Sequence, residues 1–148
     1  MIKGQASRDI ARSVDTVYDF VVVHFFDNYP RWSPEVRELE ALNTREVAMG
    51  TRGRQVRVDQ GRRSETRFEV TELQPGRRVV FDGDLQARFA IRYNFEPRGD
   101  DACRLHFEFE LKKVYLYMRP FEKLIRMAIE QGAENTVRNI KGLVERER

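Results

Sequence analysis

The chain of 148 residues has few side chains that could start metal or nucleophilic chemistry. His24, His106 and Cys103 are its only histidines and cysteine, and they do not stand at the spacing of a metal-ligand set. No nucleophile lies in a strand-turn-helix elbow that would activate it. Neither a GxGxxG nor a GxxxxGK(S/T) loop is present to hold a nucleotide phosphate. We therefore predict no metal and no cofactor, and the sequence assigns no catalytic residue.

Polar residues on apolar strand faces are better candidates for a site, because burying one without a partner costs about 1–3 kcal/mol. From residue 36 to residue 113 apolar residues recur with a period of two, as in antiparallel strands with one buried face. Three polar residues share a face with apolar neighbours in this pattern: Arg54, Thr66 and Tyr93. The structural alternatives are an arginine that reaches solvent at a strand end and a tyrosine that bonds only a backbone carbonyl.

Large apolar residues on the same faces are predicted to border the interior, either as plain core or as the walls of a pocket. These residues are Phe68, Phe89, Ile91, Phe107 and Phe109. Two asparagines, Asn135 and Asn139, stand one turn apart beside the apolar stripe of a predicted C-terminal helix. They are candidates to bind the polar end of a ligand, or else boundary residues of that helix.

Hydrophobic periodicity indicates the elements that position these residues. Residues 2–11 form a predicted strand, and Ser13 is the predicted N-cap of a helix over residues 14–26. The prolines of NYPRWSP indicate a turn or one short second helix. Further strands are predicted at residues 36–43, 51–59, 64–70, 77–84, 85–96 and 103–111.

Two stretches predict which side chains face the core. In CRLHFEFEL the alternation predicts that Leu105, Phe107 and Phe109 are buried and that Glu108 and Glu110 are exposed. From about residue 118 to 145 the period becomes 3.6, which predicts one long helix against the buried face of the sheet. Its predicted buried stripe is Phe121, Leu124, Ile125, Ala128, Ile129, Gly132, Thr136, Ile140 and Leu143.

Composition narrows the class of protein. The net charge is +3, but 27 basic residues are scattered among 24 acidic ones, which is typical of a solvated surface and does not favour a nucleic-acid partner. The N-terminal stretch MIKGQASRDI has no apolar signal region, and no apolar run approaches membrane-spanning length, so we expect a cytoplasmic protein. A single cysteine permits no internal disulfide. The length favours one domain over residues 1–148.

Several stretches together resemble one superfamily. They are SVDTVYDFVV, NYPRWSPEV, MGTRGRQVRV, FEVTELQPGRRVVFDG, YNFEPRGDDACRLHFEFEL and the ending NIKGLVERE. The chain resembles the START-like, Bet v 1-like (SRPBCC) helix-grip superfamily, and within it the polyketide cyclase/dehydrase-like group. The resemblance implies an α+β fold in which a curved antiparallel sheet of about seven strands surrounds a long C-terminal helix, with two short helices after the first strand. It also implies a cavity between sheet and helix, which we expect to measure a few hundred cubic ångströms.

In a helix-grip arrangement the turn after the first helix closes one end of the cavity. Tyr29 and Trp32 in NYPRWSP would then anchor this turn in the apolar interior, and they are also candidates to touch a ligand. We expect the cavity to be bordered by Trp32 together with aromatic residues of the sheet. For Trp32 the alternative is structural anchoring alone.

Three functions remain open at this stage. The first is binding of a hydrophobic or aromatic small molecule, polyketide-like or lipid-like, without chemistry. The second is a polyketide cyclase, aromatase or dehydratase, in which Arg54 stabilises an enolate and Tyr93 or Tyr29 moves a proton. The third is a quinone- or lipid-handling protein at a membrane surface, helped by the basic charge. The sequence leaves the oligomeric state undetermined.

Overall fold

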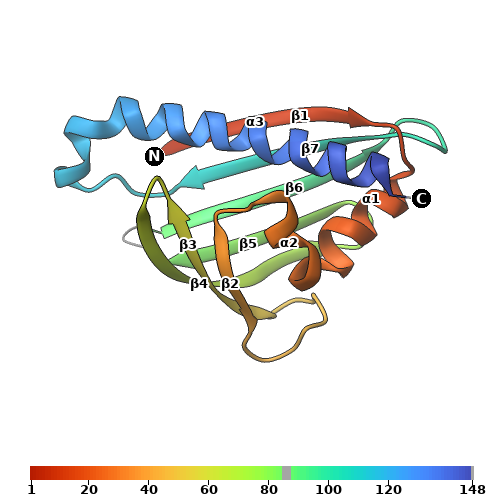
Figure 1. Ribbon diagram of the computed structural model, residues 1–148, viewed down its shortest axis with the longest axis horizontal. Helices are drawn as coiled ribbons and strands as arrows, with labels where there is room; N and C mark the ends of the chain where they lie inside the picture. The colour runs from red at the N-terminus through yellow and green to blue at the C-terminus, as the bar shows by residue number, and fades with distance from the viewer. Residues whose placement is uncertain (85–87, 148) are drawn as a thin grey trace.

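The computed structural model describes residues 1–84 and 88–147, and it confirms the predicted α+β helix-grip fold. Seven antiparallel strands form one curved sheet in the order β1-β7-β6-β5-β4-β3-β2 (Figure 1). Leu85, Gln86 and Ala87, which the sequence places in a strand, lie outside the described residues. The strands are β1 (Ile2–Ile10), β2 (Val36–Ala41), β3 (Arg52–Asp59), β4 (Arg62–Gln74), β5 (Arg78–Asp84), β6 (Arg88–Pro97) and β7 (Cys103–Leu111).

The segment after β1 is helical throughout, but it is not the single helix predicted for residues 14–26. It consists of α1 (Val14–Tyr18), a π-helical turn η1 (Asp19–Val23) and α2 (Phe25–Trp32). Ser13 caps α1 as predicted, because its side chain accepts a hydrogen bond from the Thr16 amide. The π turn closes where the His24 amide donates to the Asp19 carbonyl at 3.0 Å. The wider turn changes the helical phase and so turns the aromatic residues of α2 toward the sheet.

The long C-terminal helix α3 (Glu122–Arg146) follows a 3-10 turn, η2 (Leu116–Phe121), and packs chiefly against β1 and β7 (Figure 1). Its second half buries Ala133, Val137, Ile140 and Val144. Of the predicted stripe only Ile140 is buried, because the buried face is offset from the predicted one in the second half, where Gly132 is exposed and Thr136 and Leu143 are half-buried. In the first half the predicted stripe is largely in solvent, and Leu124 is 64% exposed. The reason is that this half rests close to edge strand β1 through Ile129, so side chains on its other faces meet solvent.

Strand β7 keeps the predicted alternation of faces, but neither carboxylate is exposed as predicted, because Glu110 is buried and Glu108 is half-buried. Leu105 and Phe107 are buried as predicted, and Phe109 is half-buried. Glu110 is buried rather than exposed, because Arg92 of β6 donates to it at 2.7 Å and to Glu108 at 2.5 Å. The ion pairs lie on the outer face of these two strands and leave both carboxylates only slightly exposed to water.

The apolar core has two parts. The larger part lies between the concave face of the sheet, α1–α2 and the second half of α3. The smaller part consists of Ile2, Phe89 and Leu111, covered by half-buried residues that include Tyr115 and Met118 of the η2 region. No helix of the described residues is both long enough and apolar enough to cross a bilayer.

Candidate functional site

Helix α2 forms one wall of the candidate site. Phe25, Phe26, Tyr29 and Trp32 are all buried and face the concave side of the sheet. The segment is held at both ends, because the Asn28 side chain donates to the Phe20 carbonyl at 2.9 Å and the Asn139 side chain of α3 donates to the Trp32 carbonyl at 3.0 Å. The proline-containing stretch therefore positions aromatic rings inside the protein, as the resemblance implied for Tyr29 and Trp32.

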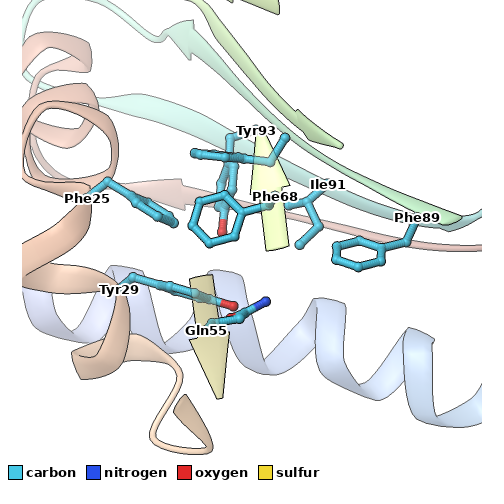
Figure 2. A pocket seen from close by; sticks show the side chains of 8 residues that line it. Phe25, Tyr29, Gln55, Phe68, Phe89, Ile91 and Tyr93 are labelled. Carbon is cyan, nitrogen blue, oxygen red and sulfur yellow. The ribbon is translucent and has the colours of Figure 1, made fainter. Parts of the chain in front are cut away.

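The sheet forms the opposite wall, with Phe68, Phe81, Phe89, Ile91 and Tyr93 around a narrow interior space (Figure 2). Two of these rings have their ends against glycines of the neighbouring strand. The ring of Phe68 covers Gly53, and the ring of Phe89 covers Gly83, so a Cβ at either glycine would lie within 2.4 Å of ring carbon. The absence of a side chain at both glycines thus makes room for the rings in these positions.

The enclosed space is much smaller than predicted. Its volume is about 10 Å³, at the lower limit for a single water molecule, rather than a few hundred cubic ångströms. The α2 rings occupy the volume that the curvature of the sheet creates. Phe25 stacks on Tyr29 with centroids 4.9 Å apart and on Phe81 at 4.6 Å, and its edge meets Phe68. The rings of the described structure therefore act as a plug as well as walls.

A half-buried arginine closes the polar end of the site. Arg57 Nη1 donates to the Tyr29 hydroxyl at 3.0 Å and to Ser33 Oγ at 3.1 Å. The other side of the guanidinium holds both carboxylate oxygens of Asp59, at 3.1 and 3.2 Å. Burial works against the charged form, yet Tyr29 and Asp59 outweigh it and raise the pKa of Arg57. The guanidinium is therefore a fixed positive charge at the edge of the aromatic interior.

The two tyrosines of the site remain protonated at neutral pH. Burial raises the pKa of Tyr29 above its ordinary value, although Arg57 acts in the opposite direction. Burial also raises the pKa of Tyr93. Both shifts move the tyrosine pKa further above pH 7, whereas a proton-transfer group works best with a pKa near the working pH. The pair is therefore suited to hydrogen bonding rather than to proton transfer.

Three buried polar atoms in this region have no hydrogen-bond partner among the described residues: Trp32 Nε1, Gln55 Oε1 and Thr66 Oγ1. Gln55 and Thr66 are direct cross-strand partners on β3 and β4, so their side chains lie side by side on the concave face. The Gln55 amide lies beside the Tyr29 hydroxyl (Figure 2). The Trp32 ring is 6.3 Å from that of Tyr93. Besides the tyrosine hydroxyls, this interior thus contains two unpaired oxygens, on Gln55 and Thr66. The Trp32 Nε1 donor lies close enough to the Tyr93 hydroxyl to act on its pKa.

Most of the predicted site residues come together. Tyr29, Phe68, Phe89 and Tyr93 line the space, and Thr66 is buried beside it. Three others lie at its edge or behind it. Trp32 packs on Tyr29 at 5.6 Å, Phe107 packs behind Tyr93 at 5.1 Å, and Asn139 bonds to the Trp32 backbone. Asn135 is held by Gln131 and Arg138 on the helix surface, which favours the structural alternative for this residue.

The orientation predicted for Arg54 is wrong. Phe68 pairs with Gly53 and Thr66 pairs with Gln55, so these residues share the concave face and Arg54 must point to the convex one. There its guanidinium pairs with Glu38, Glu40 and Glu65 at 3.0 to 3.4 Å. Arg54 cannot stabilise an enolate in the interior. The valines at positions 56 and 58, which share its face, gave the misleading apolar signal.

Sequence reasoning missed four residues of the site: Phe25, Gln55, Arg57 and Phe81. The two on β3 had a usable signal, because Gly53 alternates with them and a glycine inside a strand often marks a close approach to another group. Phe25 belongs to the predicted first helix, but the π turn that directs it inward has no evident sequence mark. Phe81 follows two other apolar residues in β5, so the alternation of apolar and polar residues did not indicate which of them faces the interior.

Comparison with known families and structures is consistent with this geometry. A family model described as polyketide cyclase / dehydrase and lipid transport matches residues 1–145. The chain belongs to this family. A search of curated proteins finds no match. The earlier resemblance to the polyketide cyclase/dehydrase-like group is therefore confirmed.

Solved structures share the fold of this polyketide cyclase/dehydrase and lipid transport family member. TTHA0849 from Thermus thermophilus is 19% identical, with a TM-score of 0.73 and coverage of 96% of each chain. A START superfamily protein from Mycobacterium smegmatis is 17% identical, with a TM-score of 0.71 and coverage of 97% of each. Truncated norcoclaurine synthase from Thalictrum flavum is 14% identical, with a TM-score of 0.70, covering 99% of this chain and 94% of the other. At these identities the likeness shows the fold alone.

Proposed function

We propose that the protein binds an aromatic small molecule that carries a hydrogen-bonding oxygen, in the interior between α2 and the concave face of β3–β6. The family and the fold suggest hydrophobic ligand binding. The observation that carries the proposal is the pair of unpaired buried oxygens, Gln55 Oε1 and Thr66 Oγ1, beside the Trp32 and Tyr93 rings. Each unpaired atom costs about 1–3 kcal/mol, and a ligand oxygen or hydroxyl would recover that loss.

A ligand must displace side chains, because the closed interior holds no more than a water molecule. Phe89 is the side chain best suited to move. It lines one end of the space but belongs to the smaller core cluster, whose other buried members among the described residues are Ile2 and Leu111. Phe89 stacks on one half-buried ring, Phe109, whereas Phe25 stacks on two buried rings of the larger cluster, so Phe89 needs less free energy to leave its position.

Two probes of similar size and different polarity test the proposal. 2-Naphthol and naphthalene are titrated into the protein while the fluorescence of Trp32, its only tryptophan, is followed. We expect 2-naphthol to bind more tightly. Thr66→Val together with Gln55→Leu should weaken 2-naphthol by about five- to tenfold, the value of one hydrogen bond, and leave naphthalene unchanged. Thr71→Val is the matched control, since Thr71 lies exposed on the same strand and bonds to Asp82.

Native mass spectrometry of the freshly purified protein gives an independent test, because a co-purified aromatic molecule would be detected directly. Failure of both naphthalene probes to bind, together with ligand-free spectra, would overturn the proposal and identify the aromatic interior as a solid core. Equal loss of both probes in the double variant would show that the unpaired atoms support packing rather than ligand recognition.

A further inference from the structure

One end of the molecule exposes a group of large apolar side chains that packing within the chain does not explain. Leu116, Tyr117, Phe121, Leu124 and Met127 are between 57% and 81% exposed. They lie in η2 and the first turns of α3, at the left of Figure 1, at the opposite end of the helix from α1 and α2. We call this surface the η2–α3 end. Phe121 ends η2, and the spacing of three residues from it to Leu124 and on to Met127 of α3 keeps these side chains on neighbouring positions of the outer helix surface.

The same segment carries the excess positive charge of the chain. Residues 112–127 contain five basic residues and one acidic residue, a net charge of +4, whereas the whole chain has a net charge of +3. The remainder therefore carries a net charge of −1. The five basic residues are Lys112, Lys113, Arg119, Lys123 and Arg126, and Glu122 is the acidic one. Basic residues that are scattered elsewhere are thus concentrated around the exposed apolar group.

We propose that the η2–α3 end docks on an anionic lipid bilayer surface. Apolar and aromatic side chains on a short helical segment insert at the level of the lipid headgroups, and lysine and arginine side chains around them contact anionic headgroups. The aromatic residues, Met127 and the arginines would suit a protein interface as well, but three of the five basic residues are lysines, which are depleted at protein interfaces and are attracted to anionic headgroups. The inference does not depend on the interior site, since none of the five exposed apolar residues lines it.

Some basic side chains of the η2–α3 end already pair with carboxylates, and others are available to contact lipid headgroups. Lys112 pairs with Asp82 at 2.6 Å, and Arg126 lies 3.8 Å from Glu122. Lys113 is placed over the Tyr115 ring at 4.8 Å, a contact that leaves its charge uncompensated by any carboxylate among the described residues. Lys123 likewise has no carboxylate partner among the described residues, so Lys113 and Lys123 are the lysines to change in a test.

Sedimentation of the full chain with vesicles tests the proposal. The vesicles are phosphatidylcholine alone or phosphatidylcholine with about 30 mol% phosphatidylglycerol. We expect binding to the anionic vesicles at least about tenfold stronger than to the neutral ones. Lys113→Gln with Lys123→Gln should reduce anionic binding by on the order of tenfold, and Phe121→Ser with Leu124→Ser should reduce it similarly. All of these side chains are exposed, so the variants should keep the wild-type circular dichroism spectrum.

The matched control removes the same charge elsewhere. Arg63→Gln with Arg67→Gln changes two exposed residues of β4 and should leave vesicle binding unchanged. An equal loss in this control would show binding by overall charge and overturn the docking surface. Equal binding to neutral and anionic vesicles, or full binding by the serine variant, would also overturn it. So would a wild-type dimer in sedimentation equilibrium that the serine variant converts to a monomer, because the η2–α3 end would then be a contact between copies of the chain.

Discussion

The Tyr29 hydroxyl accepts a hydrogen bond of 3.0 Å from Arg57, although the two residues are 28 positions apart and come from α2 and β3. The same guanidinium nitrogen bonds to Ser33, just after the end of α2. Arg57 thereby ties the helix that carries the aromatic wall to the strand that carries Gln55. The same arginine therefore forms the polar end of the site and holds α2 against the sheet.

The first prediction concerns this attachment. Tyr29→Phe should lower the free energy of unfolding by about 1–2 kcal/mol, because it removes a hydrogen bond to a charged group and leaves the guanidinium with its Ser33 and Asp59 contacts. Urea denaturation measures the loss. Arg57→Gln should cost more than Arg54→Gln by at least about 1 kcal/mol, since Arg54 makes only surface ion pairs on the convex face. Equal losses for the two arginines would contradict the assigned facing of β3.

The second prediction concerns the glycine beneath Phe68. Gly53→Ala should destabilise the protein by at least about 1–3 kcal/mol, because the new Cβ would lie 2.2 Å from the end of the Phe68 ring, which cannot shift without disturbing Phe25 and Phe81. Thermal and urea denaturation measure the change. Gly132→Ala in α3 is the control, since its Cβ would meet open space, and it should stabilise the helix by about 0.5–1 kcal/mol. A neutral Gly53→Ala would mean that the Phe68 ring readily moves away.

The strands, the main turns and the long helix could be predicted from the sequence because each depends on local periodicity. Parity within a strand could not always be predicted. The interior of β3 is set by cross-strand pairing with β4, and Val56 is buried on the outer face, where its partners are Glu38 and Glu65. When the inward face of β3 is chosen only by its apolar residues, the face of Val56 is taken as inward. The prediction then names Arg54 as a site residue and misses Gln55 and Arg57.

The volume of the site was also beyond sequence reasoning. A resemblance to a fold implies a space between sheet and helix, but the volume left in it depends on how far the α2 rings extend into that space. The π turn of η1 determines how far the α2 rings extend toward the sheet. A π turn contains one residue more than an α-helical turn, and hydrophobic periodicity in so short a segment does not reveal the extra residue.

The third prediction tests the facing of α3. Ile140→Ala should cost about 2–4 kcal/mol, because Ile140 is fully buried in the larger core cluster. Leu124→Ala should lie within about 0.5 kcal/mol of wild type, since its side chain is largely in solvent. Chemical denaturation of the two variants measures both. A large loss for Leu124→Ala would show that this residue is covered in solution, as it would be in a dimer formed through the η2–α3 end.

The fourth prediction concerns the pH dependence of stability at Cys103, which is fully buried in β7. Burial raises the pKa of the Cys103 thiol from 9.0 to about 11. Between these values the unfolded chain releases the thiol proton while the folded protein keeps it. The free energy of unfolding should therefore be independent of this thiol below about pH 9 and should decrease as the pH rises toward 11. Tyr29 and Tyr93, whose pKa values are also raised, add a loss of the same sign above pH 10. Urea denaturation of wild type and Cys103→Ala, from about pH 8 to 10, isolates the thiol, because Cys103→Ala should flatten the decline between pH 9 and 10. An unchanged decline in Cys103→Ala, or rapid reaction of the native thiol with a disulfide reagent, would show that the thiol is not held protonated by burial.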